Sequence, residues 1–117
     1  MNNSDAVAEW SKMHARLSAE ASLRNDSQAV AFEILAAYDS LPPEDRASIL
    51  PVLAEWLVSP DERLRYDAAF IVSQRRIREM SVAVQNALAR CETMPGPHAL
   101  YEAKKLQRIL GELTSDA

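Results

Sequence analysis

The sequence predicts an all-α fold of six helices. Apolar residues recur at spacings of three and four along most of the chain, the period of one helix face, and no stretch shows the alternation of a strand. Proline and polar breaks divide the chain into segments of about 12 to 20 residues with short connections. Only two of the 117 residues are glycine, whereas tight β-hairpins depend on glycine. These observations favour antiparallel neighbouring helices.

The first two helices are predicted over residues 4–23 and 27–40. Residues 25–27 supply a break and an N-cap between them. The second helix carries apolar residues around much of its circumference, so we expect other helices to pack on more than one side of it. The buried stripe of the first helix is expected to comprise Val7, Trp10, His14, Leu17 and Ala21.

The next two helices are predicted over residues 43–58 and 60–78. Pro51 lies inside the third helix, where proline removes a backbone hydrogen bond and predicts a kink. Ser59 and Glu62 have the spacing of a capping box, with Ser59 as the expected N-cap. The buried stripe of the fourth helix is expected to comprise Leu64, Ala68, Ile71 and Val72.

The last two helices are predicted over residues 79–91 and 98–113, separated by the turn residues of segment 94–97. Val82 and Leu100 are expected on their apolar faces. Paired in order, the six helices form three antiparallel hairpins of about 35 to 40 residues, the period of helical-repeat proteins. The length suits one domain, residues 1–117.

One central segment, residues 49–72, resembles the HEAT repeat. The resemblance implies a right-handed α-α superhelix of about three hairpins, with the second helices lining a concave binding surface. It implies no reaction, because a fold does not fix a function. The residues that carry the resemblance are Leu50-Pro51-Val52-Leu53, Leu57, Ser59-Pro60-Asp61, Leu64-Arg65 and Ala68-Ala69.

Residues suited to catalysis or metal binding are sparse. His14 and His98 stand at opposite ends of the chain, and no metal-binding spacing or nucleophile elbow occurs. Cys91 has only Arg90 beside it, and adjacent helix positions do not face each other, so we expect a small packing residue. We therefore expect no enzyme, no catalytic residue, no metal and no cofactor.

The composition bears on location. The apolar runs are interrupted long before the roughly 20 residues that a membrane span needs. The first residues lack the basic start and apolar stretch of a secretory signal, and the single cysteine precludes an internal disulfide. We expect a cytoplasmic protein that does not enter a membrane.

Charge is distributed unevenly along the chain. Through Glu62, eleven acidic residues face four basic ones, a net charge of −7; from Arg63 onward, nine basic residues face six acidic ones, a net charge of +3. Ordinary solvated helix faces also explain such a pattern. Because surface fields steer partners, a second interpretation is a surface for a charged partner.

The sequence favours a non-catalytic protein-binding module, with an immunity or antitoxin protein that blocks a bacterial toxin as the leading hypothesis. Acidic side chains would then meet the basic surface of the toxin. For Glu55 and Asp39 the alternative is bulk solvent, and for Tyr66 and Phe70 it is the core. The expected contact residues are Glu33, Asp39, Glu55, Asp61, Tyr66, Asp67 and Phe70.

Two other functions stay open. One is an adaptor or scaffold in a larger protein assembly. The other is a nucleic-acid accessory factor, which the sequence pI of about 5.1 disfavours because dedicated nucleic-acid domains are usually basic. Such a factor would use a basic rim formed by Arg75, Arg76, Lys104, Lys105 and Arg108.

Overall fold

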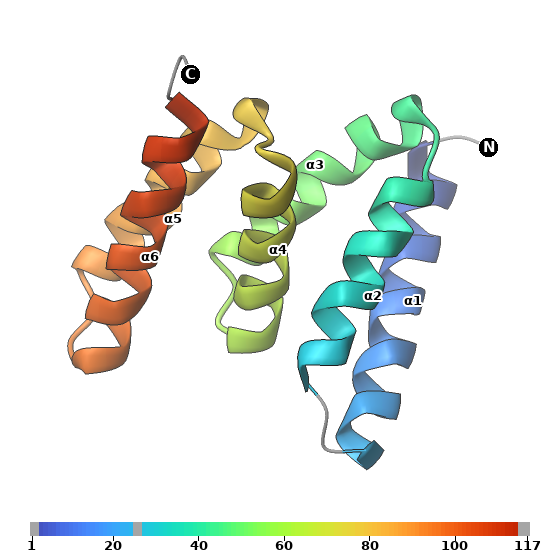
Figure 1. Cartoon of the computed structure of the whole chain (residues 1–117), viewed down its shortest axis with the longest axis horizontal. Coiled ribbons are helices and arrows are strands. Elements are labelled where there is room, and N and C mark those ends of the chain that lie inside the picture. The colour runs from blue at the N-terminus through green and yellow to red at the C-terminus, as the bar shows by residue number, and fades with distance from the viewer. Residues whose placement is uncertain (1–2, 25–26, 115–117) are drawn as a thin grey trace. The chain divides into compact units, whose positions relative to one another are not determined.

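The structure is a computed structural model that describes residues 3–24 and 27–114. Within these ranges it contains six α-helices, one 3-10 turn and no β-strand (Figure 1). The prediction of an all-α fold with six helices is confirmed. The elements are α1 (Asn3–Arg24), α2 (Ser27–Ser40), α3 (Pro43–Leu57), α4 (Glu62–Arg75), η1 (Arg78–Met80), α5 (Ser81–Glu92) and α6 (Pro97–Thr114).

Four helices, α1, α2, α3 and α6, begin and end within one residue of the prediction. The helix α3 continues through Pro51. The expected burial of Ala21 and the expected N-cap at residues 25–27 lie outside the described side chains.

The end of α4 differs most from the prediction, which extended this helix to residue 78. Arg76 has left-handed backbone angles, φ 45° and ψ 58°, and stops the helix after Arg75. The Arg76 N–H donates to the Ser73 carbonyl (3.3 Å) and the Ile77 N–H donates to the Val72 carbonyl (3.2 Å). This pair of bonds is a Schellman motif. The left-handed position of such a motif is usually a glycine, so the arginine at position 76 did not indicate in the sequence that the helix ends.

The start of α4 also corrects the prediction. Asp61, not Ser59, is the N-cap: its carboxylate accepts the Arg63 N–H at 2.9 Å. The Ser59 hydroxyl oxygen accepts the Asp61 N–H at 3.0 Å and orders the turn before the helix. Two short polar side chains compete for the cap, and the later one is nearer to the unpaired N–H groups of the first turn.

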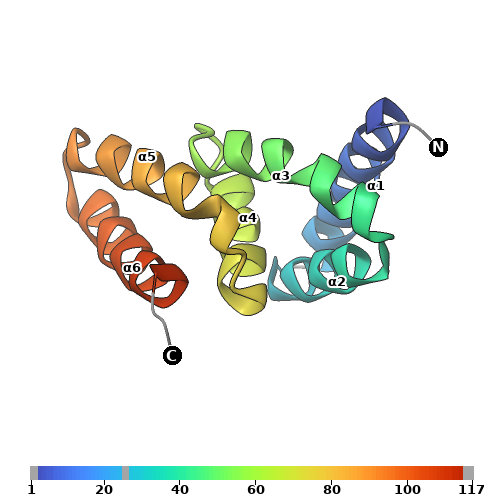
Figure 2. The ribbon, with the colours of Figure 1, turned by 90° about the horizontal axis from the view of Figure 1, so that it is seen from above.

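The chain divides into two compact units, Met1–Leu53 and Ala54–Ala117, with the boundary inside α3. In the first unit, α1 and α2 run antiparallel side by side (Figures 1 and 2). Trp10 meets Tyr38 edge to face, with ring centroids 6.4 Å apart. Phe32 on α2 is 64% exposed, so the prediction of neighbours around most of this helix is wrong on that side.

In the second unit, α5 and α6 form an antiparallel pair, and α4 lies against α6 (Figures 1 and 2). Val82 and Leu100 are exposed, because the apolar faces of α5 and α6 are narrower than predicted. The single domain and the right-handed superhelix stay predictions. Fully buried side chains of this unit include Ala68, Ile71, Val72, Val84 and Ile109.

Candidate functional site

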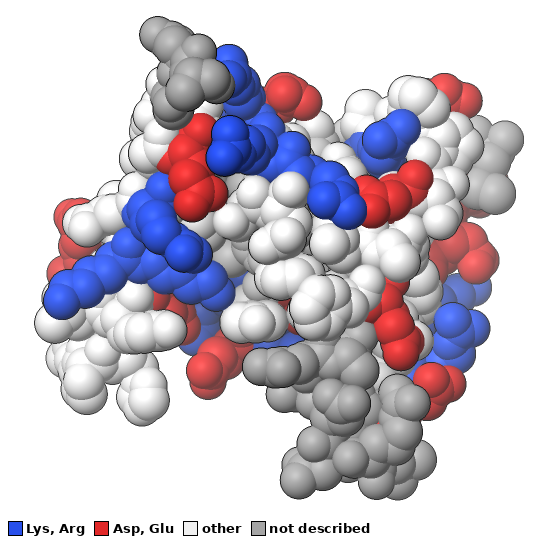
Figure 3. All heavy atoms as spheres, viewed as in Figure 1, with Lys and Arg blue, Asp and Glu red and all other residues white. Residues whose placement is uncertain are grey.

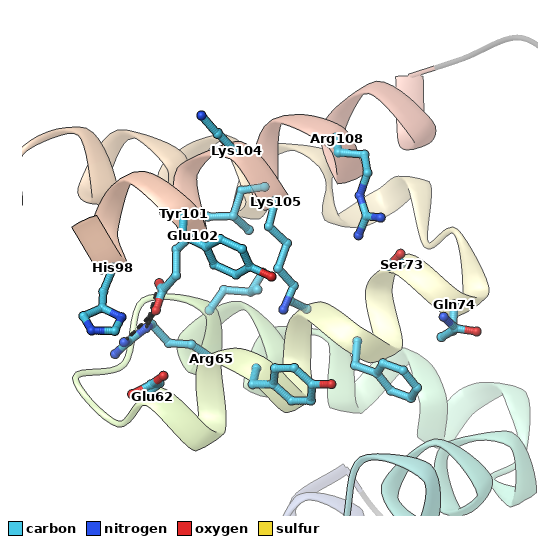
Figure 4. A pocket seen from close by; sticks show the side chains of 15 residues that line it. Glu62, Arg65, Ser73, Gln74, His98, Tyr101, Glu102, Lys104, Lys105 and Arg108 are labelled. Carbon is cyan, nitrogen blue, oxygen red and sulfur yellow. Dashed lines mark hydrogen bonds and ion pairs between the residues drawn. The ribbon is translucent and has the colours of Figure 1, made fainter. Parts of the chain in front are cut away.

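A groove of about 610 Å³ lies between α4 and α6, within the second unit (Figure 4). Its apolar lining comes from Leu57, Ala69, Phe70 and Leu106, joined by the aromatic side chains of Tyr66 and Tyr101. Its charged and polar lining comprises Glu62, Arg65, Ser73, Gln74, His98, Glu102, Lys104, Lys105 and Arg108.

Two aromatic rings and one ammonium group form the central contact of the groove. Tyr66 and Phe70 lie one turn apart on α4, with ring planes 9° from parallel and centroids 6.3 Å apart. Lys105 reaches across from α6 and places its Nζ 4.3 Å from the centroid of the Tyr66 ring. This cation–π contact joins the two helices.

Lys105 is half-buried, and Glu102 and Asp67 act on its charge only from beyond ion-pair distance. No carboxylate of the described residues lies within 4.0 Å of its Nζ. Burial lowers the pKa of Lys105, and the positive charge of Arg108 acts in the same direction, while Glu102 and Asp67 act against both. A positive group is therefore held partly out of water beside an open groove, where an anion would stabilise it.

An ion pair holds one end of the groove. Arg65 on α4 donates from Nη2 to Glu102 Oε1 at 2.9 Å and from Nε to Oε2 at 3.1 Å. Its Nη1 donates to the Ser59 carbonyl at 2.9 Å, so one guanidinium ties the turn before α4 to α6. The hydrogen bond from Arg65 is the main cause of the lowered pKa of Glu102. This geometry makes Arg65 and Glu102 a neutral, rigid wall of the groove.

Cys91 packs against the same ion pair. Its thiol lies 3.8 Å from Glu102 Oε2, and the residue is buried. Burial raises the pKa of the Cys91 thiol, and the nearby Glu102 carboxylate raises it further. The thiol stays protonated at neutral pH, which agrees with a packing residue rather than a nucleophile.

Further basic residues extend the charged side of the groove along α6. Arg108 points toward α4, whereas Lys104 points away from it (Figure 4). Arg108 Nε lies 4.0 Å from Glu112 Oε1, at the outer limit of an ion pair. Over α6 and the C-terminal end of α4, Lys and Arg side chains form a band on the face seen in Figure 3. This band gives the groove a positive side.

Four of the expected contact and rim residues come together in the groove: Tyr66, Phe70, Lys105 and Arg108. Lys104 lines only its edge, with the side chain pointing away from α4. Tyr66 is 41% exposed and Phe70 is partly exposed, so neither side chain is fully buried in the core.

The expected acidic contact surface is not assembled in the same way. Asp67 is fully buried, so the prediction that it meets a partner is wrong. The reason is that α4 is buried over a wider arc than the single stripe read from the sequence. Asp61 is exposed but caps α4. Glu33 and Asp39 are exposed on α2 in the first unit, and Glu55 is exposed on α3 outside the groove.

The basic rim is only partly assembled. Arg75 and Arg76 are exposed at the end of α4 and do not line the groove, unlike the three basic residues of α6. The rim was predicted as one set from charge alone. The part of α4 that lines the groove ends at Gln74, so Arg75 and Arg76 lie just beyond it.

Sequence reasoning missed Glu102, Tyr101 and the role of Arg65. Arg65 and Glu102 are 37 positions apart, on different helices, and no local spacing links them. Tyr101 is an exposed aromatic residue beside the charged positions of α6. Its position next to Glu102 and near Lys104, on the polar side of the helix, was the one feature of the sequence that could have indicated this part of the groove.

The chain matches no protein-family model, no curated protein and no solved structure in the comparisons made. The HEAT resemblance stays a prediction. Among the described residues, no helix has the length and apolar character needed to cross a membrane. The groove is therefore the feature from which a function can be proposed.

Proposed function

We propose that this chain is a non-catalytic binding module that holds a protein partner in the groove between α4 and α6. The observation that carries the proposal is Lys105, a half-buried cation over Tyr66 that has no carboxylate of the described residues within 4.0 Å of its Nζ. Aromatic side chains ringed by polar and charged groups are typical of interface hot spots. A partner that supplies an anion there would compensate the lost hydration of the ammonium group.

The HEAT-like architecture belongs to the same proposal, because helical repeats offer their second helices to partners. Within it, an immunity or antitoxin protein acting on a bacterial toxin stays a prediction, as does an adaptor in a larger assembly. A cytoplasmic location also stays a prediction. The burial of Asp67 and the capping role of Asp61 count against a carboxylate contact surface on α4. The support lies with the cationic groove.

Quantitative affinity capture tests the proposal. The tagged full-length chain is compared with Tyr66→Ala, which removes the ring under Lys105, and with Phe32→Ala, which removes an exposed aromatic residue of the first unit. Recovery of a partner should fall about 10-fold or more for Tyr66→Ala and stay unchanged for Phe32→Ala.

Circular dichroism must show that both variants remain helical and unfold near the wild-type temperature. Equal recovery of every captured protein by wild type and Tyr66→Ala would refute a binding role for the groove.

A further inference from the structure

We infer that the occupant of the α4/α6 groove is a short acidic peptide segment that carries an apolar or aromatic side chain. Its carboxylates would lie near Lys105 and Arg108, and its apolar side chain would lie against Tyr66 and Phe70. The inference rests on the proposed function and specifies the chemistry of its partner.

The charges of the groove favour an anionic ligand at particular positions. Arg65 is neutralised by Glu102 at 2.9 Å, so it offers little to a ligand. Lys105 has no carboxylate within ion-pair distance in the described part of the chain, and Arg108 has only a marginal contact with Glu112 at 4.0 Å. Both point from α6 toward α4 (Figure 4). Two cations on one side of a groove, one without an ion pair in the described residues and one with only a marginal contact, are suited to one or two carboxylates.

The remaining lining favours an apolar group beside that anion. Tyr66 and Phe70 present parallel rings, and Leu57 and Leu106 add aliphatic surface. The volume of about 610 Å³ lies in the range of small-ligand sites, about 300 to 1,000 Å³. Such a space holds a few side chains rather than a whole domain. A short segment with one apolar anchor fits it.

A peptide suits these features better than a nucleic acid. The groove is also lined by Glu62, and the whole chain carries a net charge of −4. A phosphate backbone carries a charge at every nucleotide, so it would meet Glu62 as well as the cations. A peptide can place carboxylates only where Lys105 and Arg108 lie. The observations therefore favour discrete carboxylates over a continuous polyanion.

Fluorescence anisotropy with the full-length chain tests the inference. The probe is a short fluorescein-labelled peptide made of glutamate, phenylalanine and leucine, in which glutamates flank the apolar anchor. Matched peptides replace glutamate by glutamine, or the apolar residues by alanine, and labelled oligodeoxythymidylate represents single-stranded nucleic acid. The acidic apolar peptide should bind with a Kd of about 10 to 100 µM, and each matched peptide about 10-fold more weakly.

Variants locate the binding site. Lys105→Met keeps most of the aliphatic stem and removes the charge, so binding of the acidic peptide should weaken about 10-fold. Lys12→Met is the matched control, because Lys12 is an exposed lysine of the first unit, and it should leave binding unchanged. Lys105→Met should melt close to the wild-type temperature, since removing a charge that burial disfavours offsets the loss of the cation–π contact with Tyr66. A loss of binding would then not result from unfolding.

Three results would overturn the inference. The first is tighter binding of oligodeoxythymidylate than of the peptide, with loss in Lys105→Met, which would assign the groove to nucleic acid. The second is equal binding of the glutamate and glutamine peptides, and the third is no binding of the acidic peptide at about 1 mM. If partner capture still depends on Tyr66 in any of these cases, the proposed binding function stands and only the acidic peptide is rejected.

Discussion

Removing the ion pair between Arg65 and Glu102 should destabilise the second unit measurably. The guanidinium and the carboxylate share bonds of 2.9 and 3.1 Å, and the two side chains are only 15% and 26% exposed. Hydrogen bonds to charged groups contribute about 1.5 to 3 kcal/mol each, and the remaining exposure and the desolvation of both ions reduce that gain. We expect a coupling free energy of about 2 kcal/mol between the two side chains.

A double-mutant cycle measures this coupling. The reference protein is the Trp10→Phe variant, in which the fluorescence of Trp56 in the second unit reports the unfolding transition. This protein, its Arg65→Met and Glu102→Gln variants and the double variant are unfolded in urea.

The pair of Glu9 and Lys12 serves as the reference for this cycle. These side chains are 68% and 76% exposed and 3.9 Å apart, so their coupling, read from the ellipticity of the first unit, should stay below about 0.5 kcal/mol. A coupling free energy below about 0.5 kcal/mol for Arg65 and Glu102 as well would refute the structural reasoning.

The same pair predicts a pH dependence. Because the pKa of Glu102 is lowered in the folded chain, the folded state holds its carboxylate ionised at pH values where the unfolded chain begins to protonate it. The contribution of the pair is fully present above the unfolded value of about 4.3 and is lost as pH falls through the lower folded value. The difference in unfolding free energy between wild type and Glu102→Gln should be constant above about pH 5.5 and shrink below it. A difference that grows on acidification would contradict this.

Two further predictions concern the ends of α4. Asp61→Ala removes the side chain that accepts the Arg63 N–H, so urea unfolding should show a loss of about 1 kcal/mol, most of which Asp61→Asn should restore; an unchanged midpoint for the alanine variant would argue against the cap. Arg76→Gly relieves a left-handed arginine with φ 45° and should raise the unfolding free energy by about 0.5 to 1 kcal/mol, whereas Arg75→Gly, in the helix, should lower it; stabilisation by both would contradict the assigned backbone.

The helices could be predicted from the sequence because their signals are local. Apolar spacing and the position of Pro43 each act within a few residues, and α3 begins at this proline as predicted. The end of α4 could not be predicted, since Arg76 adopts a left-handed conformation that is normally found at glycine. Local signals therefore define where helices exist better than where they stop.

The groove could be predicted only in part. Tyr66, Phe70 and Lys105 were all singled out, but on separate grounds, as aromatic contacts and as a basic rim. Their meeting depends on the packing of α4 against α6, which no spacing within one helix reports. The burial of Asp67 has the same origin, because it requires knowing how wide an arc of α4 its neighbours cover.

The position of Lys105 has a consequence for chemical labelling. The chain has three lysines, and burial beside Arg108 lowers the pKa of Lys105, so a larger fraction of its amine is unprotonated near neutral pH than for an ordinary lysine. An amine-directed acylating reagent thus has in this side chain a nucleophile inside the groove itself. A bound occupant would shield this amine, and mass spectrometry of the modified peptide would footprint occupancy whatever the chemical identity of the occupant.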